Sequence, residues 1–264
     1  MSEELRPNAP TSSIWRPSLI VFIAWVAIEL VLQWLQTGGR AAQMADLVRG
    51  GPVWGVIAAA VFVVAAITYL KWWTAVGAVR PQNAGLLWPP VLVLMVYMGI
   101  ALRVGLPSWP IVVIVALNTA FVGVSEELMF RGIALNATVR RYGVRKGVLI
   151  AAALFGSLHV LNAITTHQLS IAIGQALVAS LFGIWAGALR VRTGSVLPLI
   201  AIHWLWDGLL ILAGGPAALF ALPAAIGLGA WGLWLLQDYR AVAADTADAA
   251  HVADGADGAD TSRP

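Results

Sequence analysis

Seven ionisable side chains lie inside long apolar runs of this sequence, and their types and spacing suit acid–base chemistry. A charge at bilayer depth costs several kcal/mol unless it is paired or hydrated, so such residues indicate function. A carboxylate and two imidazoles gathered there are the groups needed to activate a water molecule and stabilise an oxyanion. The seven residues are Glu29, Glu126, Glu127, Arg131, His159, His203 and Asp207.

The run SEELMFR places two carboxylates and a guanidinium on one predicted helix. At about 100° per residue, Glu127 and Arg131 fall within about 40° of each other, one turn apart, with the acid N-terminal to the base. Glu126 is rotated about 140° from Arg131 and cannot easily share that pair. The spacing predicts one neutralised carboxylate, Glu127, and leaves Glu126 for another partner. Alternatively, all three charges simply mark the cytoplasmic end of a span.

Two further runs, FGSLH and HWLWD, each place their first and last residues one helical turn apart. His159 follows Phe155 in the first run, and Asp207 follows His203 in the second. In the second, the Cβ atoms of His203 and Asp207 are expected about 6 Å apart. That spacing allows the carboxylate to orient the imidazole, both side chains to ligate one metal ion, or only a local hydrogen bond. His159, in the first run, equally fits an interhelical hydrogen bond. Glu29 has no local partner, and either a cavity-facing or a structural role is open to it.

The elements that position these residues follow from composition. The 264 residues are 60% hydrophobic and 11% charged, whereas soluble domains carry roughly a quarter charged residues. Apolar runs of about 20 residues recur, each long enough to cross a bilayer as a helix. We expect an all-α, polytopic integral membrane protein with about eight transmembrane helices around an intramembrane polar cavity. The spans are expected near 17–36, 52–70, 86–104, 110–137, 147–162, 168–189, 195–213 and 216–236.

Loop charges predict the orientation, since cytoplasmic loops carry an excess of Lys and Arg. The odd-numbered loops hold three basic residues, Arg40, Arg49 and Arg103. We expect a cell-membrane protein with both termini in the cytoplasm. The tails and even-numbered loops hold twelve basic residues: Arg6, Arg16, Lys71, Arg80, Arg140, Arg141, Arg145, Lys146, Arg190, Arg192, Arg240 and Arg263.

Three segments follow from this division. Residues 1–16 form a cytoplasmic N-tail and residues 17–237 the transmembrane domain. Residues 238–264 are rich in Ala, Asp and Gly, and we expect them to be disordered.

Several function classes are excluded by what the sequence lacks. It has no cysteine, so disulfides, thiolate metal sites and cysteine nucleophiles are excluded. It has no basic cluster interleaved with aromatics, so no nucleic-acid partner is expected. It also lacks the GxSG, paired-aspartate and HExxH patterns of other intramembrane proteases.

Together, EELMFRG (126–132), FGSLH (155–159) and HWLWD (203–207) resemble the three motifs of the CPBP family. That family includes the CAAX-processing type II endopeptidases and the bacteriocin-immunity Abi proteins. Its patterns are EExxxR, FxxxH and Hxxx(N/D), in that order on successive membrane helices. Each motif is short, but all three in order are specific, and the resemblance covers roughly residues 110–210.

The resemblance implies an eight-span fold with the active site in a cavity open to the cytoplasmic side. It implies an intramembrane endopeptidase that hydrolyses a membrane-associated or lipidated peptide, in CAAX-type processing or in a bacteriocin-immunity-like role. Glu126 and His159 would position and activate the attacking water. His203 and Asp207 would stabilise the oxyanion or help to hold a metal, and Glu127 with Arg131 would brace the helix.

Position 207 departs from the many family members that have asparagine there. A charged aspartate cannot donate a hydrogen bond to an oxyanion, so Asp207 favours orienting His203, a protonated carboxyl or metal ligation. The family is commonly labelled a metalloprotease family. His159, His203 and Asp207 would fill three positions of a catalytic zinc site and leave the fourth for water. A metal-free reaction uses the same residues.

Two hypotheses from other classes compete with the peptidase. A proton-coupled transporter would use the Glu/His/Asp set as a relay, although no inverted repeat of the kind common in transporters is visible. A non-catalytic membrane scaffold or immunity protein would bind a partner through the cavity.

Overall fold

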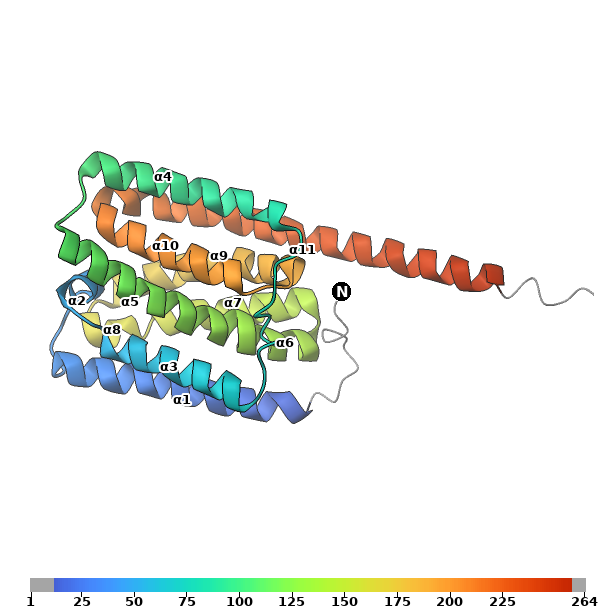
Figure 1. Ribbon diagram of the computed structural model, residues 1–264, viewed down its shortest axis with the longest axis horizontal. Coiled ribbons are helices and arrows are strands. Elements are labelled where there is room, and N and C mark those ends of the chain that lie inside the picture. The colour runs from blue at the N-terminus through green and yellow to red at the C-terminus, as the bar shows by residue number, and fades with distance from the viewer. Residues whose placement is uncertain (1–11, 258–264) are drawn as a thin grey trace, which may run out of the picture.

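The fold is a bundle of long helices, mostly antiparallel to their neighbours (Figure 1). The computed structural model describes residues 12–257, with side-chain surroundings for residues 14–237. No β-strand occurs in residues 12–257, and the all-α expectation is confirmed. The elements are α1 (Ser12–Thr37), α2 (Met44–Gly50), α3 (Trp54–Tyr69), η2 (Ala84–Leu87), α4 (Trp88–Val104), α5 (Trp109–Glu127), η3 (Leu128–Ala134), α6 (Leu135–Tyr142), α7 (Val144–His159), α8 (Asn162–Thr166), α9 (Leu169–Thr193), α10 (Leu197–Ala213) and α11 (Gly215–Asp257).

Large apolar side chains cover the outside of the bundle, as lipid contact requires. Ile20, Met95 and Leu219 are 68%, 67% and 77% exposed, and a soluble monomer rarely shows such contiguous apolar surface. The chain is a multi-pass membrane protein. Every expected span coincides with a helix, but length and composition alone identify six spans among the described residues. The number of spans is seven if α2 and α3, which are bent by 82° relative to each other, count as one span. Helix α10 is apolar but shorter than these spans.

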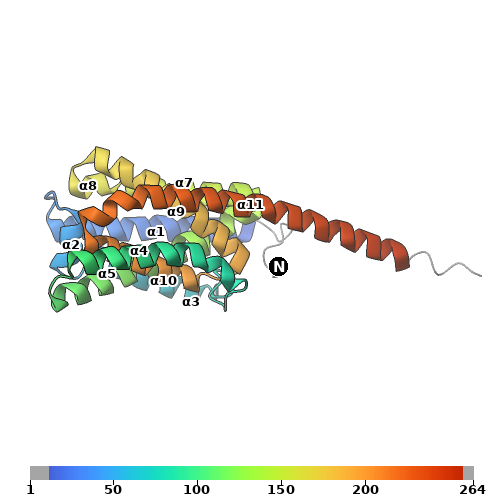
Figure 2. The same ribbon diagram turned by 90° about the horizontal axis from the view of Figure 1, so that it is seen from above.

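The long helices alternate in direction, which gives the bundle two distinct ends (Figures 1 and 2). We call the end where α1 begins the N-terminal end; the connections α3–α4, α6–α7 and α9–α10 also lie there. The other end, here the far end, carries α2, α8 and the connections α4–α5 and α10–α11.

Glycines let the helices that carry the three motifs approach closely. A Cβ on Gly123 of α5 would lie 2.8 Å from the Ile200 carbonyl oxygen of α10. On α9, a Cβ on Gly183 would lie 2.7 Å from the Ala152 Cα of α7. Small residues at such crossings allow backbones to pack within van der Waals distance in a membrane. They fix the positions of α5, α7, α9 and α10 relative to one another.

Gly156, within FGSLH, gives a direct test of this packing. Its Cβ would overlap the Ser180 hydroxyl and lie 2.5 Å from the Ala176 carbonyl oxygen. We expect Gly156→Val to cost about 1–3 kcal/mol by overpacking, seen as a lower Tm in detergent. Gly99→Ala is the control, because a Cβ there meets nothing within 4 Å. An unchanged Tm for Gly156→Val would contradict the close crossing.

The last helix, α11, extends beyond the bundle (Figure 1). It runs to Asp257 and so includes the first part of the segment for which we expected disorder. Alanine, frequent in that segment, is the strongest helix former, which is a physical reason for the helix. Residues 258–264 of the expected tail and 1–11 of the N-tail lie outside the described residues.

Candidate active site

Glu127 connects the first and third motifs. Its Oε1 accepts a hydrogen bond from Arg131 Nη1 at 2.8 Å, the ion pair expected from the helical spacing. The same oxygen accepts a hydrogen bond from Nδ1–H of His203 on α10 at 2.7 Å. All three side chains are buried, and Glu127 is fully so. The glutamate thus holds the His203 ring in place, a contact that the spacing alone did not predict.

The helix changes its hydrogen-bond pattern immediately after the two glutamates. Residues Leu128–Ala134 form a π-helical segment between α5 and α6, and all of them are buried. Such widened turns are rare and occur frequently at functional sites. Here the segment begins at the residue after Glu127 and contains Arg131.

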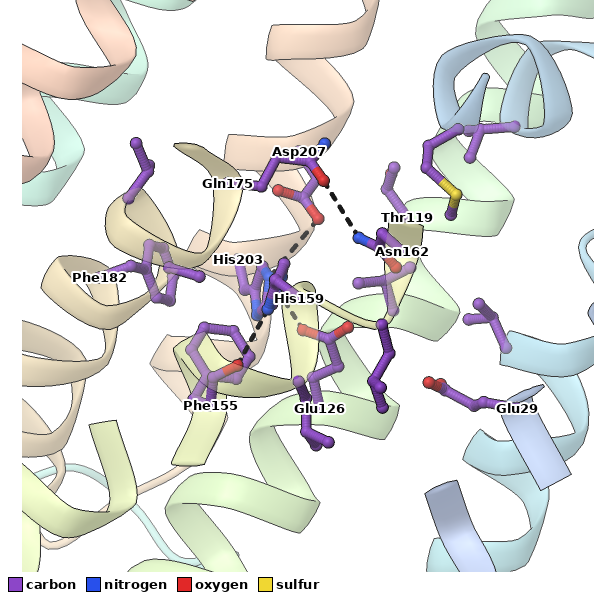
Figure 3. Close-up of a pocket in the computed structure, with 18 of the residues that line it drawn as sticks. Glu29, Thr119, Glu126, Phe155, His159, Asn162, Gln175, Phe182, His203 and Asp207 are labelled. Carbon is purple, nitrogen blue, oxygen red and sulfur yellow. Dashed lines mark hydrogen bonds and ion pairs between the residues drawn. The ribbon is translucent and has the colours of Figure 1, made fainter. Parts of the chain in front are cut away.

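Glu126 points into a cavity (Figure 3), whereas Arg131 does not line that cavity, in keeping with their different angles on the helix. Its carboxylate oxygen Oε2 lies 3.7 Å from Nε2 of His203. Asp207 Oδ2 lies 3.5 Å from the same nitrogen, which is too long for a well-formed hydrogen bond. The exposed fractions of the Glu126 and Asp207 side chains, 17% and 32%, face the cavity. Both carboxylates are therefore accessible to a molecule bound there.

The tautomer of His159 follows from its one hydrogen bond. Its Nδ1 lies 3.0 Å from the Phe155 carbonyl oxygen, which can only accept, so Nδ1 must carry the proton that is donated. With the proton on Nδ1, the lone pair of an uncharged imidazole is on Nε2, where a water molecule can donate to it. The motif FGSLH thus supplies both His159 and the carbonyl that orients it.

Aromatic rings enclose the two histidines. The Phe155 ring lies 4.9 Å from the His159 ring and 6.0 Å from the His203 ring, centre to centre. The Phe182 ring lies 4.8 Å from the His203 ring. The Arg131 guanidinium stacks over Phe155 at 4.3 Å, a cation–π contact. These rings restrict the imidazoles and separate the buried Arg131–Glu127 pair from the cavity.

The cavity has a volume of about 550 Å³, within the range of small-molecule pockets. It contains four of the candidate catalytic residues, Glu126, His159, His203 and Asp207, whereas Glu127 and Arg131 lie behind its wall. Glu29 also faces it, from α1 on the wall opposite the histidines (Figure 3). The cavity-facing alternative for Glu29 is thus the one the fold adopts.

Two amides on the cavity wall are additional polar groups for a substrate. Asn162 Nδ2 donates to Gln175 Oε1 at 3.2 Å (Figure 3). Asn162 Oδ1 and Gln175 Nε2 have no partner in this pair and can bind a peptide N–H and C=O. Gln175 is not among the site residues predicted from the sequence. The one available signal was a large polar side chain in the middle of a mostly apolar span.

The residues described do not gather a metal site. In the described part of the chain, no three His, Asp or Glu side chains are placed to hold a metal ion. The metal site predicted at His159, His203 and Asp207 stays a prediction, and no catalytic step below depends on it.

Comparison with known families supports the motif assignment. Residues 107–209 match the family described as type II CAAX prenyl endopeptidase Rce1-like. This segment of the chain is Rce1-like. The match confirms the resemblance seen in the three motifs and implies a CAAX-type intramembrane peptidase. No curated protein and no solved structure matches the chain.

The Rce1-like segment contains every element that contributes to the catalytic constellation. It begins before α5 and ends within α10, and includes all three motifs. Helices α1 to α4 and α11 lie outside it. Of these, α1, α2, α3 and α11 complete the cavity wall, with Glu29 from α1 and Ala218 and Ala221 from α11.

Proposed function

We propose that this protein is an intramembrane endopeptidase that hydrolyses a peptide bond in a membrane-associated or lipidated substrate. The observation that carries the proposal is the shared cavity of Glu126, His159, His203 and Asp207. The buried Glu127 holds His203 toward that cavity. A proton relay or a scaffold does not require the imidazole lone pair of His159 and the carboxylate of Glu126 to face the same cavity. A hydrolase does, so the peptidase explains this arrangement better than the other two functions.

Glu126 and His159 activate the water in the proposed first step. The water donates one hydrogen bond to the Glu126 carboxylate and one to Nε2 of His159. Its oxygen attacks the carbonyl carbon of the scissile bond while Glu126 takes the proton. The carbonyl π electrons move to the oxygen, which gives a tetrahedral oxyanion.

His203 stabilises that oxyanion. Nδ1–H of His203 is engaged by Glu127, so only Nε2 can face the substrate. A proton on Nε2 allows it to donate to the oxyanion. The negative charge of Asp207, 3.5 Å from Nε2, favours the doubly protonated ring that can donate to the oxyanion. Glu126 then gives its proton to the leaving nitrogen as the carbon–nitrogen bond breaks, which restores its carboxylate.

Metal removal tests this set of steps against the zinc alternative. Because the steps use only side chains, we expect metal-stripped protein to keep its activity. Elemental analysis of purified protein before and after chelation gives the metal content. Stoichiometric zinc, with activity lost on chelation and restored by zinc, would contradict the metal-free steps.

The substrate can be sought directly in cells. Mass spectrometry of membrane peptides would compare cells with the wild-type protein and cells with Glu126→Gln. We expect new peptide termini only with the wild type. Identical termini in both would overturn the proposal.

A further inference from the structure

The cavity occupies only the far half of the bundle. Its lining includes Met44 and Ala45 of α2, Gly55 of α3, Asn162 of α8 and Ala218 of α11, all at far-end segments. None of the lining residues comes from the N-terminal-end connections 70–87, 142–144 or 193–197. The phenyl rings of Phe130, Phe155 and Phe182 close the inner side.

The positions of the polar residues along their helices also place the cavity in the far half of the bundle. At 1.5 Å per residue, His159 lies about 22 Å from the start of α7, Asp207 about 15 Å from the start of α10, and Glu29 about 25 Å from the start of α1. All three helices begin at the N-terminal end. From the far end, Asp207 and Glu29 are only about 9 Å and 12 Å deep.

The two ends differ strongly in basic residues. The far end has Arg40, Arg49 and Arg103, together with Asp46. Because cytoplasmic loops hold most Lys and Arg, the N-terminal end faces the cytoplasm. It carries nine basic residues in the described chain: Arg16, Lys71, Arg80, Arg140, Arg141, Arg145, Lys146, Arg190 and Arg192.

We propose that the catalytic cavity opens on the side of the membrane opposite the cytoplasm, and that its substrate is a peptide presented from that side. Cytoplasmic termini and a cytoplasmic cavity mouth, both expected from the sequence and the resemblance, are incompatible in this fold. The basic residues decide for cytoplasmic termini.

The substrate class follows from this orientation. An exported peptide, or the outer segment of a membrane-anchored protein, reaches the cavity directly. A lipidated C-terminus on the cytoplasmic face would have to cross the packed N-terminal half, which contains the buried Arg131, Asn136 and Thr138. The substrate part of the inference rests on the proposed peptidase function, whereas the orientation does not.

Cysteine labelling tests the orientation, because the chain has no cysteine of its own. Ala41 and Ala84 are both exposed, one at each end, so Ala41→Cys and Ala84→Cys are a chemically matched pair. In intact cells, a membrane-impermeant maleimide should label Ala41→Cys at least tenfold more than Ala84→Cys. Permeabilised cells should label both. The reverse pattern, or equal labelling in intact cells, would overturn the proposed orientation.

A third cysteine tests the cavity itself. Ala221 lines the cavity from α11. In intact cells, a small charged methanethiosulfonate should modify Ala221→Cys, and no permeabilisation should be needed. Modification only from the cytoplasmic side would overturn the proposed opening.

Labelling does not depend on cleavage, so these results separate the orientation from the peptidase proposal. If the wild-type protein produces new peptide termini, they should lie in segments outside the cytoplasm. Termini confined to cytoplasmic segments would contradict the substrate class while leaving the peptidase intact. Absence of new termini would count against the peptidase alone.

Discussion

Glu126→Gln is expected to lower kcat by about 10³-fold, within the usual contribution of a general base. Glutamine has nearly the same shape but cannot take a proton from the attacking water. The carboxylate faces the cavity, and its loss leaves both Arg131 and His203 with Glu127 as their partner. The measurement is the initial rate of peptide cleavage by purified protein in liposomes, with Tm compared in detergent.

Asp46→Asn is the matched control. It also removes one negative charge, but Asp46 is exposed on α2 and outside the cavity. Its rate should stay within about twofold of wild type, since surface substitutions usually have small effects. A Glu126→Gln protein that folds and keeps full activity would refute the role of Glu126.

Glu127→Ala is expected to destabilise the protein by about 3–5 kcal/mol, because it leaves the Arg131 guanidinium buried without its ion partner. Arg131 is 3% exposed and Glu127 is fully buried. The free energy of unfolding in detergent measures the effect. A variant as stable as the wild type would contradict the ion pair as a structural element.

The double variant Glu127→Ala/Arg131→Met separates stability from catalysis. Replacing both charges by apolar groups is often neutral or stabilising, so most of the lost stability should return. Activity should not, since Nδ1 of His203 has lost the carboxylate that holds it. Recovered activity would show that Glu127 serves only to neutralise Arg131.

Contacts within one helix were predictable from the sequence. The Glu127–Arg131 pair, and the direction of Glu126 away from that pair, follow from 3.6 residues per turn alone. The structure has both. The position of each apolar span also matched a helix, because about 20 apolar residues satisfy the bilayer only in that form. The three motifs were sufficient to predict which family the central segment matches.

Contacts between helices were not predictable in the same way. Glu127 and His203 are 76 residues apart, and their hydrogen bond depends on how closely α5 approaches α10 at Gly123. The same holds for Trp25 Nε1, which donates to Ser125 Oγ at 2.8 Å across α1 and α5. A single sequence does not give helix-pair distances.

The half of the bundle that holds the cavity could be predicted only in part from the sequence. His159 ends α7, a helix whose first turn includes Arg145 and Lys146 of the basic run, so it lies about 22 Å along the helix from its basic end. The cavity lining was needed to show that the other polar residues lie in the same half.

The most direct test of hydrolysis at this site uses purified protein, membrane peptides and water enriched in oxygen-18. With the wild type, we predict new peptide C-termini that contain one oxygen-18 atom from the attacking water. Glu126→Gln should give none above background. New termini at equal rates in both proteins, or no cleavage by the wild type, would contradict an active site built on Glu126.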